Sequence, residues 1–401
     1  MSDEPAQPRS SLRVRLRSLD PNVRALGAVS FVADLSSEIV YPIFPLFVTT
    51  VLGAPVAVLG LIEGVAEATA SLTRFPFGRW SDNAGRRRAF VLGGYGLSAL
   101  GKVFLALAFV WQVALTGRFV DRLGKGMRTA PRDALLAAGV RDDQRGLAFG
   151  LHRSMDTMGA VLGPLAALAL LHWGVSIRGV FAVAAVPGVL SVVVIWRRVR
   201  ERAPAAPAHA PLLALRLPHS RDFRWLLAGS LIFALGNSTN MFILLKAQEV
   251  GLGITGVILV YILYNLPYAA ASLPLGDLSD RIGQFPVVIG GFVVFALVYL
   301  GFAVAGGVAA VVVLFALYGL YIAATEGTSK ALISRAAPDA ERASAMGFYD
   351  SAIGIAGFAA STAGGLLWTA VGPWATFAYG CGCACAAAAV LLVAHQAPRQ
   401  A

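Results

Sequence analysis

The feature that most constrains the fold is a recurrence of long apolar segments separated by short, arginine-bearing stretches. A helix that crosses a bilayer needs about 20 predominantly apolar residues. Twelve segments meet this length, at residues 24–50, 55–77, 89–110, 112–138, 146–172, 177–196, 223–247, 254–276, 285–305, 307–333, 342–371 and 373–395. Hydrophobic residues make up 57% of the chain and charged residues 14%, which excludes a soluble or disordered protein. The pattern predicts an all-α integral membrane protein with twelve transmembrane helices.

The distribution of basic residues predicts the orientation of these helices. The formal net charge is +11, and most arginines lie between apolar segments. They gather on one side, which holds the amino tail, Arg86 to Arg88 and the central loop. Because cytoplasmic loops are enriched in arginine and lysine, we expect both termini in the cytoplasm and the chain in the cytoplasmic (inner) membrane. The charge excess therefore indicates topology rather than nucleic-acid binding. The polar residues 1–23 contain no apolar core, so no cleavable signal peptide is predicted.

The chain divides into two similar halves at an alanine- and proline-rich linker, residues 203–218. The motif from Gly78 to Gly85 matches the motif from Gly276 to Gly283 at a shift of 198, and residues 144–150 match 341–347 at a shift of 197. Internal duplication is a common plan among transporters. We therefore expect two pseudo-symmetric six-helix bundles. The expected units are a tail (1–23), a first bundle (24–196), a central cytoplasmic loop (197–222), a second bundle (223–396) and a short cytoplasmic tail (397–401).

The loop after the second segment carries a glycine, an aspartate four positions later, a second glycine and a basic cluster. These residues are Gly78, Asp82, Gly85 and Arg86, and Asp280 repeats the aspartate in the second half. The pattern resembles a loop motif of the major facilitator superfamily, and the resemblance extends over residues 24–395. It implies a transporter that works by alternating access, in which this loop acts as a conformational switch that favours the outward-facing state.

Two further motifs resemble that family in part. In the fourth segment, Arg122, Lys125 and Gly126 follow its second motif, with lysine in place of glutamine. In the fifth segment, a glycine pattern resembles the motif of drug–proton antiporters but lacks the closing glycine pair; it comprises Gly150, Gly159, Gly163 and Pro164. This resemblance places the chain near the drug and metabolite efflux branch. A small-residue packing face explains Gly159 and Gly163 equally well.

Ionisable residues occur within the apolar segments of the first half. Ionisable groups inside a bilayer are costly and usually mark a pathway or an ion pair. Helical spacing puts the acids in two pairs and the bases on one stripe of the fourth segment. The predicted proton-coupling and central-cavity residues are Asp34, Glu38, Glu63, Glu67, Arg118, Arg122 and Lys125. Two interpretations remain open: a compensated ion-pair network that holds the bundle together, or carboxylates that change protonation during the cycle. Asp34, Glu38 and Glu67, opposed by Arg118 and Arg122, are the preferred proton carriers.

The second half carries aromatic and amide groups in place of these charges. The candidates for a substrate cavity are Asn237, Asn240, Tyr261, Asn265 and Asp350. Such residues also form helix–helix hydrogen bonds and interface anchors, and the sequence leaves both roles open.

These features predict a secondary active transporter that exports a small molecule in exchange for protons. The alternatives are proton-coupled uptake of an anionic metabolite and a membrane sensor or scaffold that has lost transport. We expect a monomer whose partners are the substrate, protons and lipid. No enzymatic activity and no cofactor are expected. No metal site is expected either, because the three cysteines, Cys381, Cys383 and Cys385, fan around one helix without a nearby histidine or carboxylate.

Overall fold

A computed structural model describes residues 19–138, 145–201, 221–336 and 342–396. These residues form helices and no strand. The first half contains α2 (Pro21–Val40), η1 (Tyr41–Ile43), α3 (Phe44–Leu46), η2 (Phe47–Val51), α4 (Val56–Ala84), α5 (Arg87–Ala106), α6 (Trp111–Ala137), α7 (Arg145–His172) and α8 (Ile177–Arg198). The second half contains α9 (Arg221–Gly236), α10 (Met241–Glu249), α11 (Ile254–Ile282), α12 (Gln284–Val304), α13 (Val308–Ala336), α14 (Arg342–Ala370) and α15 (Pro373–Gln396).

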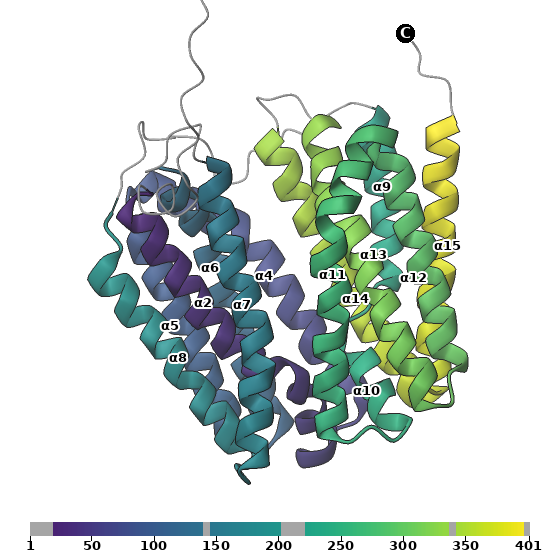
Figure 1. Ribbon diagram of the computed structural model, residues 1–401, viewed down its shortest axis with the longest axis horizontal. Helices are drawn as coiled ribbons and strands as arrows, with labels where there is room; N and C mark the ends of the chain where they lie inside the picture. Colours follow the sequence, from purple (N-terminus) through teal and green to yellow (C-terminus); the bar gives the residue numbers. More distant parts are fainter. Residues whose placement is uncertain (1–18, 139–144, 202–220, 337–341, 397–401) are drawn as a thin grey trace, which may run out of the picture.

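The helices gather into two bundles, one from each half of the chain (Figure 1). Among the described residues, eleven helical segments are long and apolar enough to cross a membrane. The twelfth crossing is α6, whose arginines and aspartates lower its hydropathy. The predicted all-α membrane fold of two six-helix bundles is confirmed, and the chain is a multi-pass membrane protein.

The first and seventh crossings are broken, although both were expected as continuous helices. After Val40 the chain passes through a 3-10 turn, a short α turn and a π turn before residue 52. Pro42 and Pro45 lie in this stretch, and proline has no backbone N–H with which to continue the helical ladder. The seventh crossing stops at Gly236 and resumes at Met241. At the shift of 198 residues these breaks correspond, so both halves interrupt their first helix at the same depth.

We use the term basic end for the end of the molecule at which α4, α8 and α15 finish, at the top of Figure 1. The opposite end holds η1, α3 and α10. There Phe44, Phe47 and Phe242 are fully buried in one apolar cluster that contains residues of both halves. The two bundles therefore meet in a dry aromatic layer at the opposite end.

Glycines let the two bundles approach closely along α4 and α14. A Cβ atom added to Gly60 would lie 2.3 Å from the backbone oxygen of Ser361, and one added to Gly64 would lie 3.0 Å from Phe358. From the other side, a Cβ on Gly354 would lie 2.3 Å from the Cβ of Ser71. Small residues spaced four apart are a common means of bringing membrane helices into contact. By comparison, α7 and α11 make a much smaller contact between the halves.

Replacing Gly60 by alanine is expected to destabilise the protein, because the added methyl group has no space against the backbone of α14. Overpacking of this kind costs about 1–3 kcal/mol. Gly96→Ala is the control, since a Cβ there has no neighbour within 4 Å. The apparent unfolding midpoint in detergent should fall for Gly60→Ala and stay near wild type for Gly96→Ala; equal midpoints would contradict the close contact.

The switch-loop residues of the first half form a local structure between α4 and α5. Gly85 has a φ of 62°, a left-handed conformation that suits glycine. Asp82 forms an ion pair with Arg87 at 2.7 Å, and Arg86 is exposed. The Asp82 contact thus stays within one half. The side chain of Asp280 lies outside the described side chains.

Gly78 and Arg74 connect the same end of α4 to other helices. A Cβ on Gly78 would lie 2.9 Å from that of Ala130, so this glycine brings α4 close to α6. One turn earlier, Arg74 reaches across to Asp350 of α14 at 2.9 Å. Both side chains of this pair are partly exposed. Asp350 therefore links the halves near the basic end and lies apart from the other predicted cavity residues.

Candidate functional site

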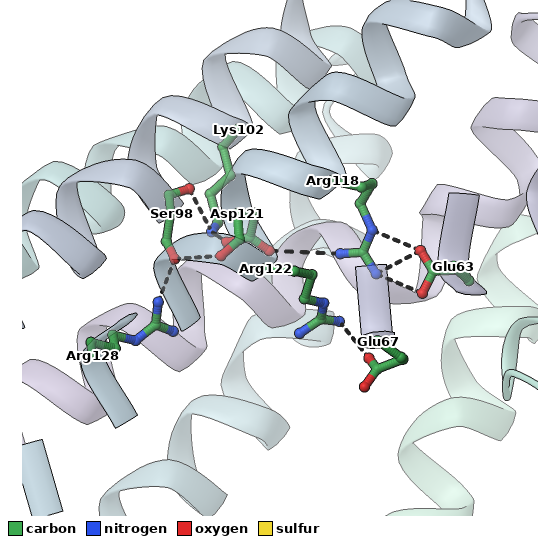
Figure 2. A network of polar contacts seen from close by, with 8 residues as sticks. All are labelled: Glu63, Glu67, Ser98, Lys102, Arg118, Asp121, Arg122 and Arg128. Carbon is green, nitrogen blue, oxygen red and sulfur yellow. Dashed lines mark hydrogen bonds and ion pairs between the residues drawn. The ribbon is translucent and has the colours of Figure 1, made fainter. Parts of the chain in front are cut away.

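A chain of polar side chains crosses the first bundle through α4, α5 and α6 (Figure 2). At its core, Arg118 donates two hydrogen bonds to Glu63, Nε to Oε1 and Nη2 to Oε2, each 2.7 Å long. The side chains of Arg118 and Glu63 are only 4% and 1% exposed. The guanidinium also lies 4.9 Å from the ring of Phe44. Glu63 is thus fixed by a bidentate, dry ion pair.

The network continues from Arg118 into α5. Asp121 lies 3.8 Å from the Arg118 guanidinium and 3.3 Å from the Lys102 amine. Ser98 donates to the backbone oxygen of Asp121 at 3.0 Å and accepts a hydrogen bond from Arg128. Close packing of α5 on α6 allows these contacts, since a Cβ on Gly101 would lie 2.9 Å from the Cβ of Asp121. Lys102, Ser98 and Arg128 are absent from the predicted site residues; the charges of Lys102 and Arg128 within apolar segments were an available signal, as were the glycines of α5 and α6.

A second, looser pair lies one helical turn further along both helices. Arg122 is 3.5 Å from Glu67, so the spacing of four on α4 matches the spacing of four on α6. The Glu67 side chain is 50% exposed, in contrast to Glu63. Lys125 is exposed as well, and within the described residues its amine has no ion-pair partner. From Arg118 to Lys125, the cations of α6 therefore pass from a buried bidentate pair with Glu63, through a looser pair with Glu67, to an exposed lysine.

The antiporter-like glycines of α7 lie directly against the two carboxylates of α2. A Cβ on Gly159 would be 2.8 Å from the Cβ of Asp34, and one on Gly163 would be 2.6 Å from the Cβ of Glu38. Their spacing of four matches that of the acids. The two glycines thus form a packing face on α7, and Asp34 and Glu38 of α2 lie against this face. Pro164 lies within α7 beside Gly163. Gly150 is also in α7, in a stretch whose side-chain surroundings are outside the described set.

Replacing Gly163 by alanine should push α2 away from α7 at Glu38, because the new methyl group overlaps the Glu38 side chain and backbone. We expect a loss of about 1–3 kcal/mol of stability together with reduced transport. Gly382→Ala on α15 is the matched control, since a Cβ there meets nothing within 4 Å. Thermal unfolding and flux, measured side by side, test this; a variant with wild-type values for both would refute the packing role.

Asp34 and Glu38 have different partners. The Tyr261 hydroxyl, from α11 of the other half, donates a hydrogen bond to Glu38. The Tyr261 ring packs on Tyr41, with centroids 5.5 Å apart. Asp34 is half-buried, and among the described residues its carboxylate makes no hydrogen bond or ion pair. Its electrostatic neighbours are two acids, Asp156 and Glu38, and two cations, Lys125 and Arg128. Arg118 and Arg122 pair with Glu63 and Glu67, so they do not directly oppose the α2 acids.

The two halves present different chemistry at matching positions. At the shift of 198, Glu63 and Glu67 of α4 correspond to Tyr261 and Asn265 of α11. Asn265 donates to the Tyr261 backbone oxygen at 2.8 Å. A carboxylate pair in the first half is thus replaced by a neutral tyrosine and amide in the second.

The remaining predicted cavity amides join a cluster of buried tyrosines. Asn237 donates to the Tyr321 hydroxyl at 3.0 Å, and Asn240 accepts from Tyr318 at 2.6 Å. Both amides flank the break between α9 and α10, so these bonds hold the interrupted helix. A further carboxylate, Glu326 of α13, accepts a hydrogen bond from Tyr268 and is exposed. Glu326 is a candidate site residue that the predicted set does not include.

No group of three or more potential metal ligands occurs among the described residues. Cys381, Cys383 and Cys385 are free thiols on α15. The candidate site therefore consists of the carboxylates, the lysine and the tyrosines described above. They lie between two membrane-embedded bundles, which is the arrangement of a membrane transporter.

The chain belongs to the major facilitator superfamily. The sequence profile of the Major Facilitator Superfamily matches residues 26–261 and 226–401. An uncharacterized MFS-type transporter of Methanocaldococcus jannaschii is 35% identical over 372 residues, which cover 91% of this chain and 92% of that protein. The inner membrane transport protein YajR of Escherichia coli is 29% identical over 171 residues, covering 40% of this chain and 36% of that protein.

Solved structures show the same fold at low sequence identity. The nucleoside transporter NupG matches with a TM-score of 0.79 and 15% identity, covering 93% of this chain and all of that one. A POT family transporter in complex with 5-aminolevulinic acid also has a TM-score of 0.79, with 15% identity, and covers 94% and 98% of the two chains. The family match, together with this fold, identifies the protein as a membrane transporter of the MFS type.

Proposed function

We propose that the protein is a proton-coupled exporter of a small molecule and that Asp34 and Glu38 carry the proton. The observation that supports this most directly is the division of the buried acids into two groups. Glu63 and Asp121 are locked onto cations inside a dry network. Asp34 has no polar partner among the described residues, and Glu38 has a neutral one. Only acids that are not paired with a cation can exchange protons without breaking an ion pair.

Glu38 also connects proton loading to the movement of the halves. Its partner, Tyr261, belongs to the other bundle. An ionised carboxylate accepts this hydrogen bond strongly, because charge-assisted bonds are about twice as strong as neutral ones. Protonation weakens the bond and with it one contact between the halves. Alternating access requires that ligand or proton binding bias one state over the other, and this contact supplies such a bias.

Two observations favour export over uptake. The α7 glycines, which resemble the antiporter motif, contact the two acids proposed to carry the proton. In addition, the multidrug resistance protein MdtH of Photorhabdus laumondii is 28% identical over 179 residues, 42% of this chain and 44% of that protein. In this proposal the basic end faces the cytoplasm and the protein lies in the inner membrane as a monomer.

One observation favours a second candidate, proton-coupled uptake of an anionic metabolite. Lys125 is exposed and has no ion-pair partner among the described residues. An exposed lysine next to the Arg122–Glu67 pair suits the recognition of a carboxylate or phosphate on the substrate. The two candidates differ in the direction of flux and in the charge of the substrate.

A growth screen followed by a vesicle assay separates these candidates. Deletion and overexpression strains are compared for sensitivity and accumulation across toxic compounds, metals and metabolites. Each compound that responds is then added to everted vesicles with a pH-sensitive dye. Export predicts resistance on overexpression and proton release from the vesicles when substrate enters. Uptake predicts sensitivity and accumulation of an anion. A response without any proton movement would overturn the coupling proposal in both forms.

A further inference from the structure

The first turn of α5 lies between two exposed tryptophans at the basic end. Trp80 of α4 is 57% exposed and packs on Phe90 of α5, with ring centroids 5.2 Å apart. Trp196 of α8 is 62% exposed, and its backbone oxygen accepts a hydrogen bond of 2.6 Å from Arg88. Exposed tryptophans at the ends of membrane-spanning helices are typical of the membrane–water interface. Here two of them flank a single helix end.

Unpaired cations gather at the same place, which we call the arginine corner. It comprises Arg86, Arg197, Arg198 and Arg200, all exposed. Within the described part of the chain none of the four has an ion-pair partner. The start of α5 and the end of α8 are held together, since the Arg88 backbone N–H donates to Glu201 at 2.9 Å. Asp82 pairs with Arg87, while Glu201 keeps its negative charge when it accepts the backbone hydrogen bond. Four arginines beside one such carboxylate leave the corner with a net positive charge.

The duplication provides an internal comparison. At the shift of 198, Trp80 corresponds to Leu278, Arg86 to Gln284 and Trp196 to Ala394. Leu278, the counterpart of Trp80, lines an apolar hollow of about 640 Å³ formed by α11, α12 and α13. At these positions, the second half lacks the counterparts of the arginine corner.

We propose that the arginine corner binds the headgroup of an anionic phospholipid. The guanidinium groups hold the phosphate through charge-assisted hydrogen bonds, and Trp80 and Trp196 flank the glycerol region. Exposed aliphatic side chains lie farther along α5 and α8, beyond a stretch of each helix without an exposed residue, and could contact the acyl chains only there; they include Leu100, Val103, Val186, Val189 and Leu190. Basic residues at a membrane surface attract anionic lipids by about a factor of five each.

Binding of fluorescent phosphatidylglycerol to the full-length protein in neutral detergent tests this proposal. Phosphatidylcholine with the same acyl chains is the reference lipid. The wild type should prefer phosphatidylglycerol. Arg197→Gln together with Arg198→Gln should weaken phosphatidylglycerol binding by roughly 10- to 30-fold and leave phosphatidylcholine binding unchanged. The control is Arg221→Gln together with Arg224→Gln, which removes two exposed arginines at the start of α9 on the same end and should change little.

Several results would overturn the proposal. Equal binding of the two lipids to the wild type would exclude headgroup selection, and equal losses in the two double variants would exclude this corner. Displacement of the lipid by inorganic phosphate at a similar concentration would show a site for free anions instead. If the Arg197 and Arg198 variant does not fold, Arg86→Gln replaces it, with an expected loss of about fivefold. No transport substrate is needed, so this result is independent of the proposed function.

Discussion

Asp34→Asn is expected to reduce proton-driven flux to the level of protein-free liposomes while leaving the protein folded. Asparagine has nearly the same shape as aspartate, but its amide does not load or release a proton. Asp34 makes no hydrogen bond or ion pair among the described residues, so the change breaks no observed bond, although charged neighbours act on the carboxylate electrostatically. Gly159 remains opposite the side chain, so the packing of α2 on α7 should persist. The measurement is uptake into proteoliposomes under an imposed pH gradient, using a substrate identified by the growth screen.

Exchange without net proton movement distinguishes loss of coupling from loss of binding. In the Asp34→Asn variant, exchange of labelled for unlabelled substrate should continue in the absence of a gradient. Glu249→Gln is a matched acid-to-amide control, because Glu249 pairs with Lys246 at 3.1 Å in α10, away from the α2 acids. Wild-type flux under a gradient in both Asp34→Asn and Glu38→Gln would contradict the proposed proton carriers. Loss of exchange as well would place Asp34 in substrate binding.

Glu63→Ala is expected to lower the free energy of unfolding by about 3–5 kcal/mol, because it leaves Arg118 buried and uncompensated. Glu67→Ala offers a control on the same helix, one turn away, and should cost about 1 kcal/mol or less because Glu67 is half exposed. Thermal unfolding in detergent, followed by tryptophan fluorescence, compares the two variants. Arg118→Ala together with Glu63→Ala should be less damaging than the sum of the single changes, since the double variant leaves no unpaired charge of this pair.

Similar midpoints for Glu63→Ala and Glu67→Ala would contradict the division into a locked pair and an accessible pair. They would also restore Glu63 as a possible proton carrier. The stability experiment therefore bears on the mechanism, because it tests which acids are free to titrate.

The sequence predicted the membrane-spanning helices well because the bilayer imposes a strong requirement on length and hydropathy. It did not predict the breaks at Tyr41 and Asn237, although the polar run Asn237 to Asn240 was an available signal for the second break. Proline is also common within membrane helices, and Pro76, Pro131 and Pro164 lie inside unbroken ones. A proline by itself therefore does not mark where a membrane helix ends.

The charged residues were identified from sequence, but of their expected partners only Arg122 opposite Glu67 is found in the structure. Asp34 and Glu38 have the same spacing as Glu63 and Glu67, so periodicity does not separate the two pairs. What separates them is the rotation of α4 toward α6 and of α2 toward α7, and that depends on packing between helices. Two glycines of α7 indicated part of this helix packing in the sequence. Gly159 and Gly163 were noted for their resemblance to a motif, while their spacing of four matched the acids they contact.

The matching interruptions of the first helix in each half have an energetic consequence. A long helix that stops short of the membrane surface leaves a small terminal piece, η1 to η2 in one half and α10 in the other. Phe44 and Phe47 of the first piece and Phe242 of the second are fully buried in the apolar cluster that both halves share. We therefore expect that separating the halves at this end exposes these rings to water, which gives the closed arrangement a hydrophobic stabilisation of its own.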